Sequence, residues 1–89
     1  LDAQTRNEAG VIFQTLSHIK ELKNLLPVAE VCHRTIASIQ ALNSFKVEYL
    51  EIVDARSLMP ITQWNEAPAL RACVAVMANN VRLIDNIEV

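Results

Sequence analysis

Few side chains in this sequence have the type and spacing that chemistry requires, and the clearest group lies near its end. Arg82, Asp85 and Asn86 all fall in the run RLIDN. Asp85 sits among the apolar positions of an alternating segment, Val81–Val89, where an unpartnered carboxylate costs on the order of several kcal/mol. We therefore expect Arg82 or the Asn86 amide to be its partner. No second acid, base or nucleophile is spaced to work with Asp85, so we interpret the group as a structural motif and predict no catalytic residue.

A metal centre is the second chemistry to consider. Two cysteines and two histidines, at Cys32, Cys73, His18 and His33, could supply ligands, but no C-x-x-C or H-x-x-x-H spacing occurs. His33 follows Cys32 directly, and adjacent helix residues do not face each other, so no base is placed to activate the thiol. We expect reduced cysteines, as in a cytosolic protein, and no bound metal.

Several function classes lack their usual signals. There is no Gly-rich phosphate loop and no nucleophile elbow. The net charge of −2 does not provide the basic surface that nucleic acids require. No apolar run approaches the roughly 20 residues that span a bilayer, and the first ten residues show no signal-peptide pattern. The sequence therefore predicts a cytoplasmic protein that binds neither nucleic acid nor membrane.

The composition predicts one small domain covering residues 1–89. Hydrophobic residues make up 52% of the chain and charged residues 20%, with one Gly and three Pro. That is enough apolar material for a core built from regular elements, with a stability on the order of 5 kcal/mol.

Helical periodicity dominates the first half of the chain. A first helix is predicted over Ala3–Lys23, starting at Asp2 or at a capping box over Thr5–Glu8. Its apolar stripe comprises Ala9, Ile12, Phe13, Leu16, Ile19 and Leu22. A second helix should begin with Pro27 in its first turn and run to about Leu42, where Asn43 and Ser44 stop it. Its apolar positions are Val28, Val31, Cys32, Ile36, Ile39 and Leu42.

Strand periodicity dominates the second half. Val47–Val53 predicts a strand, followed by a turn over Asp54–Pro60 and a surface loop over Ile61–Pro68. Ala69–Met77 and Val81–Val89 predict a hairpin joined at Asn79 and Asn80, because Asn tolerates the positive φ of a tight turn. The loop carries Trp64, which we expect to cover the edge of the core rather than to contact a partner.

These elements predict an α+β fold, an N-terminal helical hairpin followed by a three-stranded antiparallel β-sheet.

Three collinear blocks resemble one enzyme family. The ending RLIDN resembles the signature that closes the pantothenate synthetases, or pantoate–β-alanine ligases. The segment KVEYLEIVDARSLMPI resembles the family's Val-Asp-Tyr strand and the Leu-Xaa-Pro that follows it, and LDAQTR resembles the start of the family's small C-terminal lobe. Glu48 replaces the family's usual Asp, and Asn79 replaces its usual Gly.

The resemblance implies that residues 1–89 are the C-terminal, lid-like lobe of a larger two-lobe enzyme. That enzyme uses ATP and Mg²⁺ to convert pantoate into a pantoyl adenylate, which β-alanine then attacks to give pantothenate. It also implies an N-terminal lobe as partner and a homodimeric full enzyme. The family's nucleotide-binding motifs belong to the other lobe, so no catalytic, cofactor-binding or metal-binding residue carries over, and the fragment alone should be inactive. The alternative is a free-standing protein-interaction module with no catalytic activity.

Overall fold

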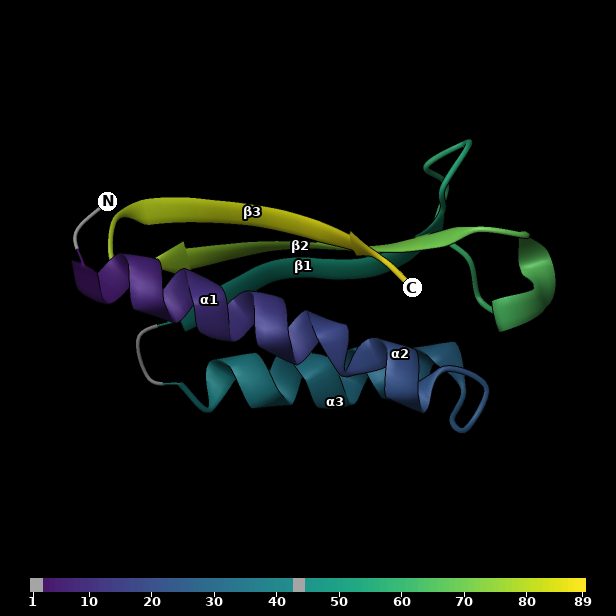
Figure 1. Ribbon diagram of the computed structural model, residues 1–89, viewed down its shortest axis with the longest axis horizontal. Coiled ribbons are helices and arrows are strands. Elements are labelled where there is room, and N and C mark those ends of the chain that lie inside the picture. Colours follow the sequence, from purple (N-terminus) through teal and green to yellow (C-terminus); the bar gives the residue numbers. More distant parts are fainter. Residues whose placement is uncertain (1–2, 43–44) are drawn as a thin grey trace.

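Two layers make up the structure, a computed structural model that describes residues 3–42 and 45–89. Helices α1 (Ala3–Ser17), α2 (Ile19–Leu22) and α3 (Val28–Gln40) precede the strands β1 (Phe45–Asp54), β2 (Leu70–Ala78) and β3 (Val81–Glu88), and a 3₁₀ helix, η1 (Trp64–Glu66), lies between β1 and β2. All three α-helices lie on one side of the sheet, and no described element covers its other face (Figure 1). The predicted α+β fold, with its N-terminal helical hairpin and three-stranded antiparallel sheet, is confirmed.

The predicted single helix over Ala3–Lys23 is interrupted at His18. Thr15 and Ser17 each donate a side-chain hydroxyl to the carbonyl four residues earlier, at 2.9 and 3.0 Å. The His18 N–H then bonds the Thr15 carbonyl, three residues back, at 3.2 Å. Hydroxyl groups that bond back to the helix backbone bend helices, and this explains why two short helices replace one long one.

The joint between the helices matches the prediction more closely. Pro27 takes an extended conformation (ψ 152°) immediately before α3 and serves as its N-cap. α3 ends at Gln40, two positions before the predicted Leu42. The predicted helix start at Asp2 and the predicted stop at Asn43 and Ser44 lie outside the described residues, as do the side chains of the alternative capping box, Thr5 and Glu8.

The sheet has the order β1-β2-β3, with both pairs antiparallel. Ala78 pairs with Val81, so Asn79 and Asn80 alone form the hairpin connection, and Asn79 has a φ of 57°. The predicted hairpin is therefore confirmed. A register shift between Val47 and Tyr49 marks a β-bulge in β1, which bends this edge strand and strengthens its twist.

The core lies between the helices and the sheet, and β2 runs through its centre. Residues at or below 1% exposure come from both layers and include Leu16, Ile19, Val31, Ile39, Leu70, Ala72, Val74, Val76 and Ala78. Phe13 was predicted in the buried stripe but is 51% exposed. It lies about 100° around the helix from Ile12, and Ile12 and Leu16 form the face that meets the sheet, so Phe13 turns toward solvent.

The loop after β1 closes one end of this core. Ile61 is buried, and half-buried Trp64 packs against the core while its indole N–H donates to the Leu26 carbonyl at 2.8 Å. The predicted core-covering role of Trp64 is confirmed. Glu66 and Gln63 form a capping box around η1, and this local network fixes a loop that the sequence predicted only as surface chain.

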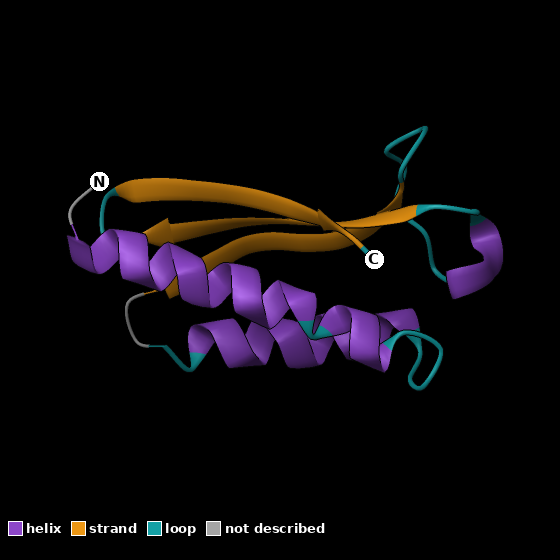
Figure 2. Ribbon diagram, in the orientation of Figure 1, coloured by secondary structure: helices purple, strands orange, loops and turns teal. Residues whose placement is uncertain are grey.

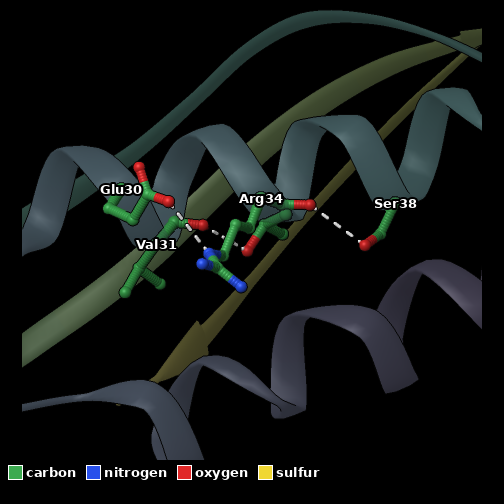
Figure 3. Close-up of polar contacts among 5 residues, drawn as sticks. Glu30, Val31, Arg34 and Ser38 are labelled. Atoms are coloured by element: carbon green, nitrogen blue, oxygen red, sulfur yellow. Dashed lines mark hydrogen bonds and ion pairs between the residues drawn. The ribbon is translucent and has the colours of Figure 1, made fainter. Parts of the chain in front are cut away.

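The polar contacts of Glu30, Arg34 and Ser38 stay within α3 (Figure 3). Arg34 Nε lies 3.0 Å from Glu30 Oε1, and Ser38 donates its hydroxyl to the Arg34 carbonyl. The buried Thr35 hydroxyl donates to the Val31 carbonyl at 2.7 Å. The Glu30–Arg34 pair is exposed, and an exposed pair with i,i+4 spacing contributes only about 0.3–0.5 kcal/mol. Unlike Thr35, these two residues lie on the solvated surface of α3.

Candidate functional site: the C-terminal strand and its surroundings

Arg82 lies on the open face of the sheet, the face away from the helices. Its Nε is 2.9 Å from Glu48 Oε2. Glu48 belongs to β1 and Arg82 to β3, so this exposed ion pair joins the two edge strands across β2. A surface pair of this kind contributes about 0–1 kcal/mol. Because Glu48 already engages the Arg82 guanidinium, this contact favours a role in joining the two strands over a role in holding a ligand.

Asn86 shares the open face with Arg82 but has a different partner. Its side-chain Oδ1 accepts two hydrogen bonds from the Arg71 guanidinium, from Nε at 2.9 Å and from Nη2 at 2.6 Å. Arg71 stands on the neighbouring strand β2. This contact occupies the amide oxygen of Asn86 and orients the guanidinium along the sheet surface.

Asp85 points to the opposite face, toward α1, and is half-buried. Its Oδ1 accepts a hydrogen bond from the Asn86 backbone N–H at 2.8 Å, whereas Arg82 is engaged by Glu48 on the other face. The Val89 N–H bonds the Leu70 carbonyl. Backbone groups alternate along an antiparallel pair, so the Asn86 N–H points to the free edge of β3. Asp85 thus satisfies one exposed edge N–H. Of the two predicted partners, Asn86 is the one that bonds Asp85, through its backbone amide and not through its side-chain amide.

The three residues of the predicted motif therefore share a strand but not a site. Two lie on the open face with separate partners, and the third lies on the helix-facing side. No pair of these side chains could act together on one substrate atom. Their contacts are those of a sheet-stabilising set, and the structural role predicted for Arg82, Asp85 and Asn86 stays a prediction.

A shallow pocket adjoins Asp85 where α1 passes the edge of β3. Its volume is about 210 Å³, and its lining residues are Ala9, Ile12, Leu83, Ile84 and Asp85. The lining is apolar apart from the one carboxylate, and no lining residue could serve as a second acid or base. This pocket suits an apolar side chain better than it suits a reaction.

A second open pocket lies at the other edge of the sheet. It measures about 230 Å³ and is bounded by the start of α3, by β1 and by the chain around Ile61. Cys32 and Glu51 contribute to its lining. Burial raises the pKa of the Cys32 thiol, the negative charge of Glu51 raises it further, and the Ile52 backbone amide opposes them. Cys32 is therefore a protonated, weakly nucleophilic thiol at neutral pH.

The second cysteine shows the same behaviour. Burial raises the pKa of the Cys73 thiol, Arg71 lowers it, and Glu51 raises it. Both cysteines are free thiols. Over residues 3–42 and 45–89, no three His, Cys, Asp or Glu side chains gather closely enough to hold a metal ion.

Comparison with known proteins decides the family. The family model described as pantoate-beta-alanine ligase matches residues 1–88. The chain belongs to the pantoate-beta-alanine ligase family. A pantothenate synthetase of Azobacteroides pseudotrichonymphae is 40% identical over 87 residues, which are 98% of this chain and 31% of that protein. A pantothenate synthetase of Phocaeicola vulgatus is 38% identical over 88 residues, covering 99% of this chain and 31% of that protein.

A solved structure gives the same answer for the fold. The crystal structure of pantothenate synthetase from Thermus thermophilus aligns with a TM-score of 0.82 and 31% identity, covering 99% of this chain and 32% of that one. The chain spans about a third of the length of the curated relatives it matches. It therefore corresponds to one portion of a pantoate-beta-alanine ligase.

Within residues 45–89, the positions that carry the family resemblance fall in three places. Arg82, Asp85 and Asn86 lie on β3, and Tyr49 lies on β1. Leu58 stands in the turn that follows β1.

Among residues 3–42 and 45–89, no helix is both long enough and apolar enough to cross a membrane.

Proposed function

We propose that this chain is the C-terminal lid lobe of an ATP-dependent pantoate–β-alanine ligase. The observation that carries the proposal is the family match over residues 1–88 by a chain that spans only about a third of its relatives. Arg82, Asp85 and Asn86 each contact a residue of the sheet itself, which supports a role in covering a site rather than in forming one. In this proposal the enzyme works in the cytoplasm as a homodimer.

The chemistry belongs to the complete enzyme. ATP, with Mg²⁺, activates pantoate: the carboxylate attacks the α-phosphorus and pyrophosphate leaves, giving pantoyl adenylate. The amine of β-alanine then attacks the acyl carbon, AMP leaves, and the amide of pantothenate forms. An acyl adenylate hydrolyses readily, so the enzyme benefits from a lobe that excludes water while the second substrate reacts.

The structure of this domain fits a rigid lid. Its two layers enclose an apolar core, and a moving lobe needs such a core if it is to close as one body. Among the described residues, no three His, Cys, Asp or Glu side chains gather closely enough to hold a metal ion. In this proposal, therefore, ATP, Mg²⁺, pantoate and β-alanine bind to the N-terminal lobe, and this chain contributes closure.

The test is a pantothenate-forming assay with ATP, pantoate and β-alanine. Residues 1–89 are assayed alone and then mixed with a separately produced N-terminal lobe at about 1 mM, a concentration that replaces the tether of the intact polypeptide. We expect no pantothenate from residues 1–89 alone and pantothenate from the mixture. Activity in residues 1–89 alone would overturn the proposed lid role, and two folded but inactive pieces would favour a free-standing interaction module instead. Circular dichroism on each piece confirms that both are folded.

A further inference from the structure

The most unusual surface feature outside the strand motif is a turn that presents two large apolar side chains to solvent. Leu58 and Met59 are each 64% exposed. They belong to residues 54–60, here called the Leu58 turn. The Leu58 turn rises from the end of β1 on the side of the sheet away from the helices (Figures 1 and 2).

The Leu58 turn is held in a defined shape by its own hydrogen bonds. The Asp54 N–H donates to the Met59 carbonyl at 2.9 Å, and the Leu58 N–H donates to the Asp54 carbonyl at 2.8 Å. The Arg56 N–H donates to Asp54 Oδ1 at 2.8 Å, and the Met59 N–H donates to the Ser57 hydroxyl at 3.2 Å. The two apolar side chains are therefore displayed on a fixed support.

The backbone at Leu58 is strained. Its φ is 62°, a region that a residue with a Cβ disfavours and that Gly, or less often Asn, adopts. The other two described residues with positive φ are both Asn, at Asn24 and Asn79. The positive φ makes leucine destabilising at this position, and its exposed side chain gains no burial in return. Strain of this kind is typical of residues with a functional role.

We propose that Leu58 and Met59 insert into an apolar pocket on the N-terminal lobe of the same polypeptide and hold the lid closed. This inference rests on the proposed function, because it assigns the contact that lid closure makes. The Leu58 turn stands on the uncovered side of the domain, where a second lobe has access without displacing a helix.

The small size of the contact selects the occupant. A stable complex between separate proteins buries about 1,200–2,000 Å², and two side chains provide far less. Within one polypeptide, the tether supplies a high effective concentration, so a small apolar contact is sufficient. It is also weak enough to break in each catalytic cycle, as a lid requires. A second copy of this chain would need a larger apolar surface than this turn offers.

The first test measures pantothenate formation by the full-length enzyme carrying Leu58→Gly. Gly accepts the positive φ, so the fold is preserved while the side chain is lost. We expect kcat to fall about tenfold, as for loss of a closing contact. Two control variants, Asn79→Gly at the other turn and Leu25→Ser at a 74% exposed apolar residue, should keep the wild-type kcat. A Leu58→Gly enzyme with unchanged kcat would overturn the closing role.

The second test reads the contact without using activity. Full-length protein is treated with hydrogen peroxide, and oxidation of Met59 is followed by peptide mass spectrometry, with the urea-unfolded protein as reference. We expect Met59 to react at least about tenfold more slowly in the folded protein, and more slowly again with ATP and pantoate present. Oxidation at the unfolded rate would overturn the proposal, whatever the kcat of the variants.

The two tests distinguish the docking role of the Leu58 turn from the proposed ligase function. If wild-type full-length protein forms no pantothenate, the proposed function fails, while Met59 protection still reports whether the turn is buried. If the enzyme is active but Met59 is unprotected, the function stands and the docking role of the Leu58 turn fails.

Discussion

The connection between β1 and β2 contains two neighbouring segments that use apolar residues in opposite ways. In residues 61–67, a capping box and an indole hydrogen bond place Ile61 and Trp64 against the core. In the Leu58 turn, a similar number of hydrogen bonds holds Leu58 and Met59 in solvent. Local hydrogen bonds can therefore hold an apolar side chain either in the core or in solvent. The first segment therefore serves the stability of this domain, and we propose that the second serves a contact outside it.

The largest effect should come from Trp64. Trp64→Ala removes a ring that covers the core and should lower the unfolding free energy by about 3 kcal/mol. Urea denaturation of the 89-residue chain measures it. Trp64→Phe keeps an aromatic ring but loses the bond to Leu26 and a small part of the packing, and it should cost about 1 kcal/mol. Equal losses in the two variants would show that the hydrogen bond, and not the packing, fixes this segment.

A gain in stability is expected from a substitution at Leu58. Leu58→Gly relieves the positive φ and should raise the unfolding free energy by about 0.5–1 kcal/mol, the strain relief exceeding the entropy that Gly costs. Thermal unfolding of the same chain reports the change. Leu58→Ala keeps a Cβ and should show no gain. A destabilised Leu58→Gly protein would mean that the leucine side chain contributes to this domain's own fold.

A pH-dependent effect is expected at Glu66. Hydrogen bonds from the Thr62 hydroxyl and from the Thr62 and Gln63 backbone amides lower the pKa of its carboxyl group. The folded pKa lies below the ordinary value of 4.5, so the stabilisation is present above that value and is lost as the pH falls through the folded pKa. Denaturation midpoints at several pH values should show Glu66→Gln less stable than wild type at about pH 7, where the carboxyl group is ionised. The difference should disappear in acid, and a constant difference would exclude the charge as its cause.

The smallest effect should come from Met59. Met59→Ala removes an exposed side chain and should change the unfolding free energy by less than about 0.5 kcal/mol. Denaturation of the isolated chain checks this value. A loss comparable to that of Trp64→Ala would contradict the contrast between the two segments.

Most of the fold follows from periodicity in the sequence. Alternation over Val81–Val89, the two-residue link at Asn79 and Pro27 before α3 each predict a local geometry with a direct physical cause. The break at His18 was not predictable from apolar spacing, because it depends on hydroxyl groups at Thr15 and Ser17 that bond back to the helix. Phe13 was misplaced because the sheet meets a narrower face of α1 than the stripe suggested.

The candidate site was less accessible to sequence reasoning. The run RLIDN brings Arg82, Asp85 and Asn86 together in sequence, but strand alternation separates them onto two faces, and their partners Glu48 and Arg71 lie far away in the chain. The same alternation, applied to Asp85, does indicate that it faces the helices. The sequence alone does not mark Leu58 as strained, because a positive φ in a turn is usually indicated by Gly or Asn and not by Leu.

The lid account is tested most directly by counting AMP released for each pantothenate formed. The isolated N-terminal lobe is supplied with ATP, pantoate and β-alanine, first without and then with residues 1–89 at about 1 mM, a concentration that replaces the tether of the intact polypeptide. We expect more than one AMP per pantothenate from the N-terminal lobe alone, because an uncovered pantoyl adenylate is hydrolysed. The ratio of AMP to pantothenate should fall toward one when residues 1–89 are added. A ratio of one from the N-terminal lobe alone, unchanged by the domain, would contradict it.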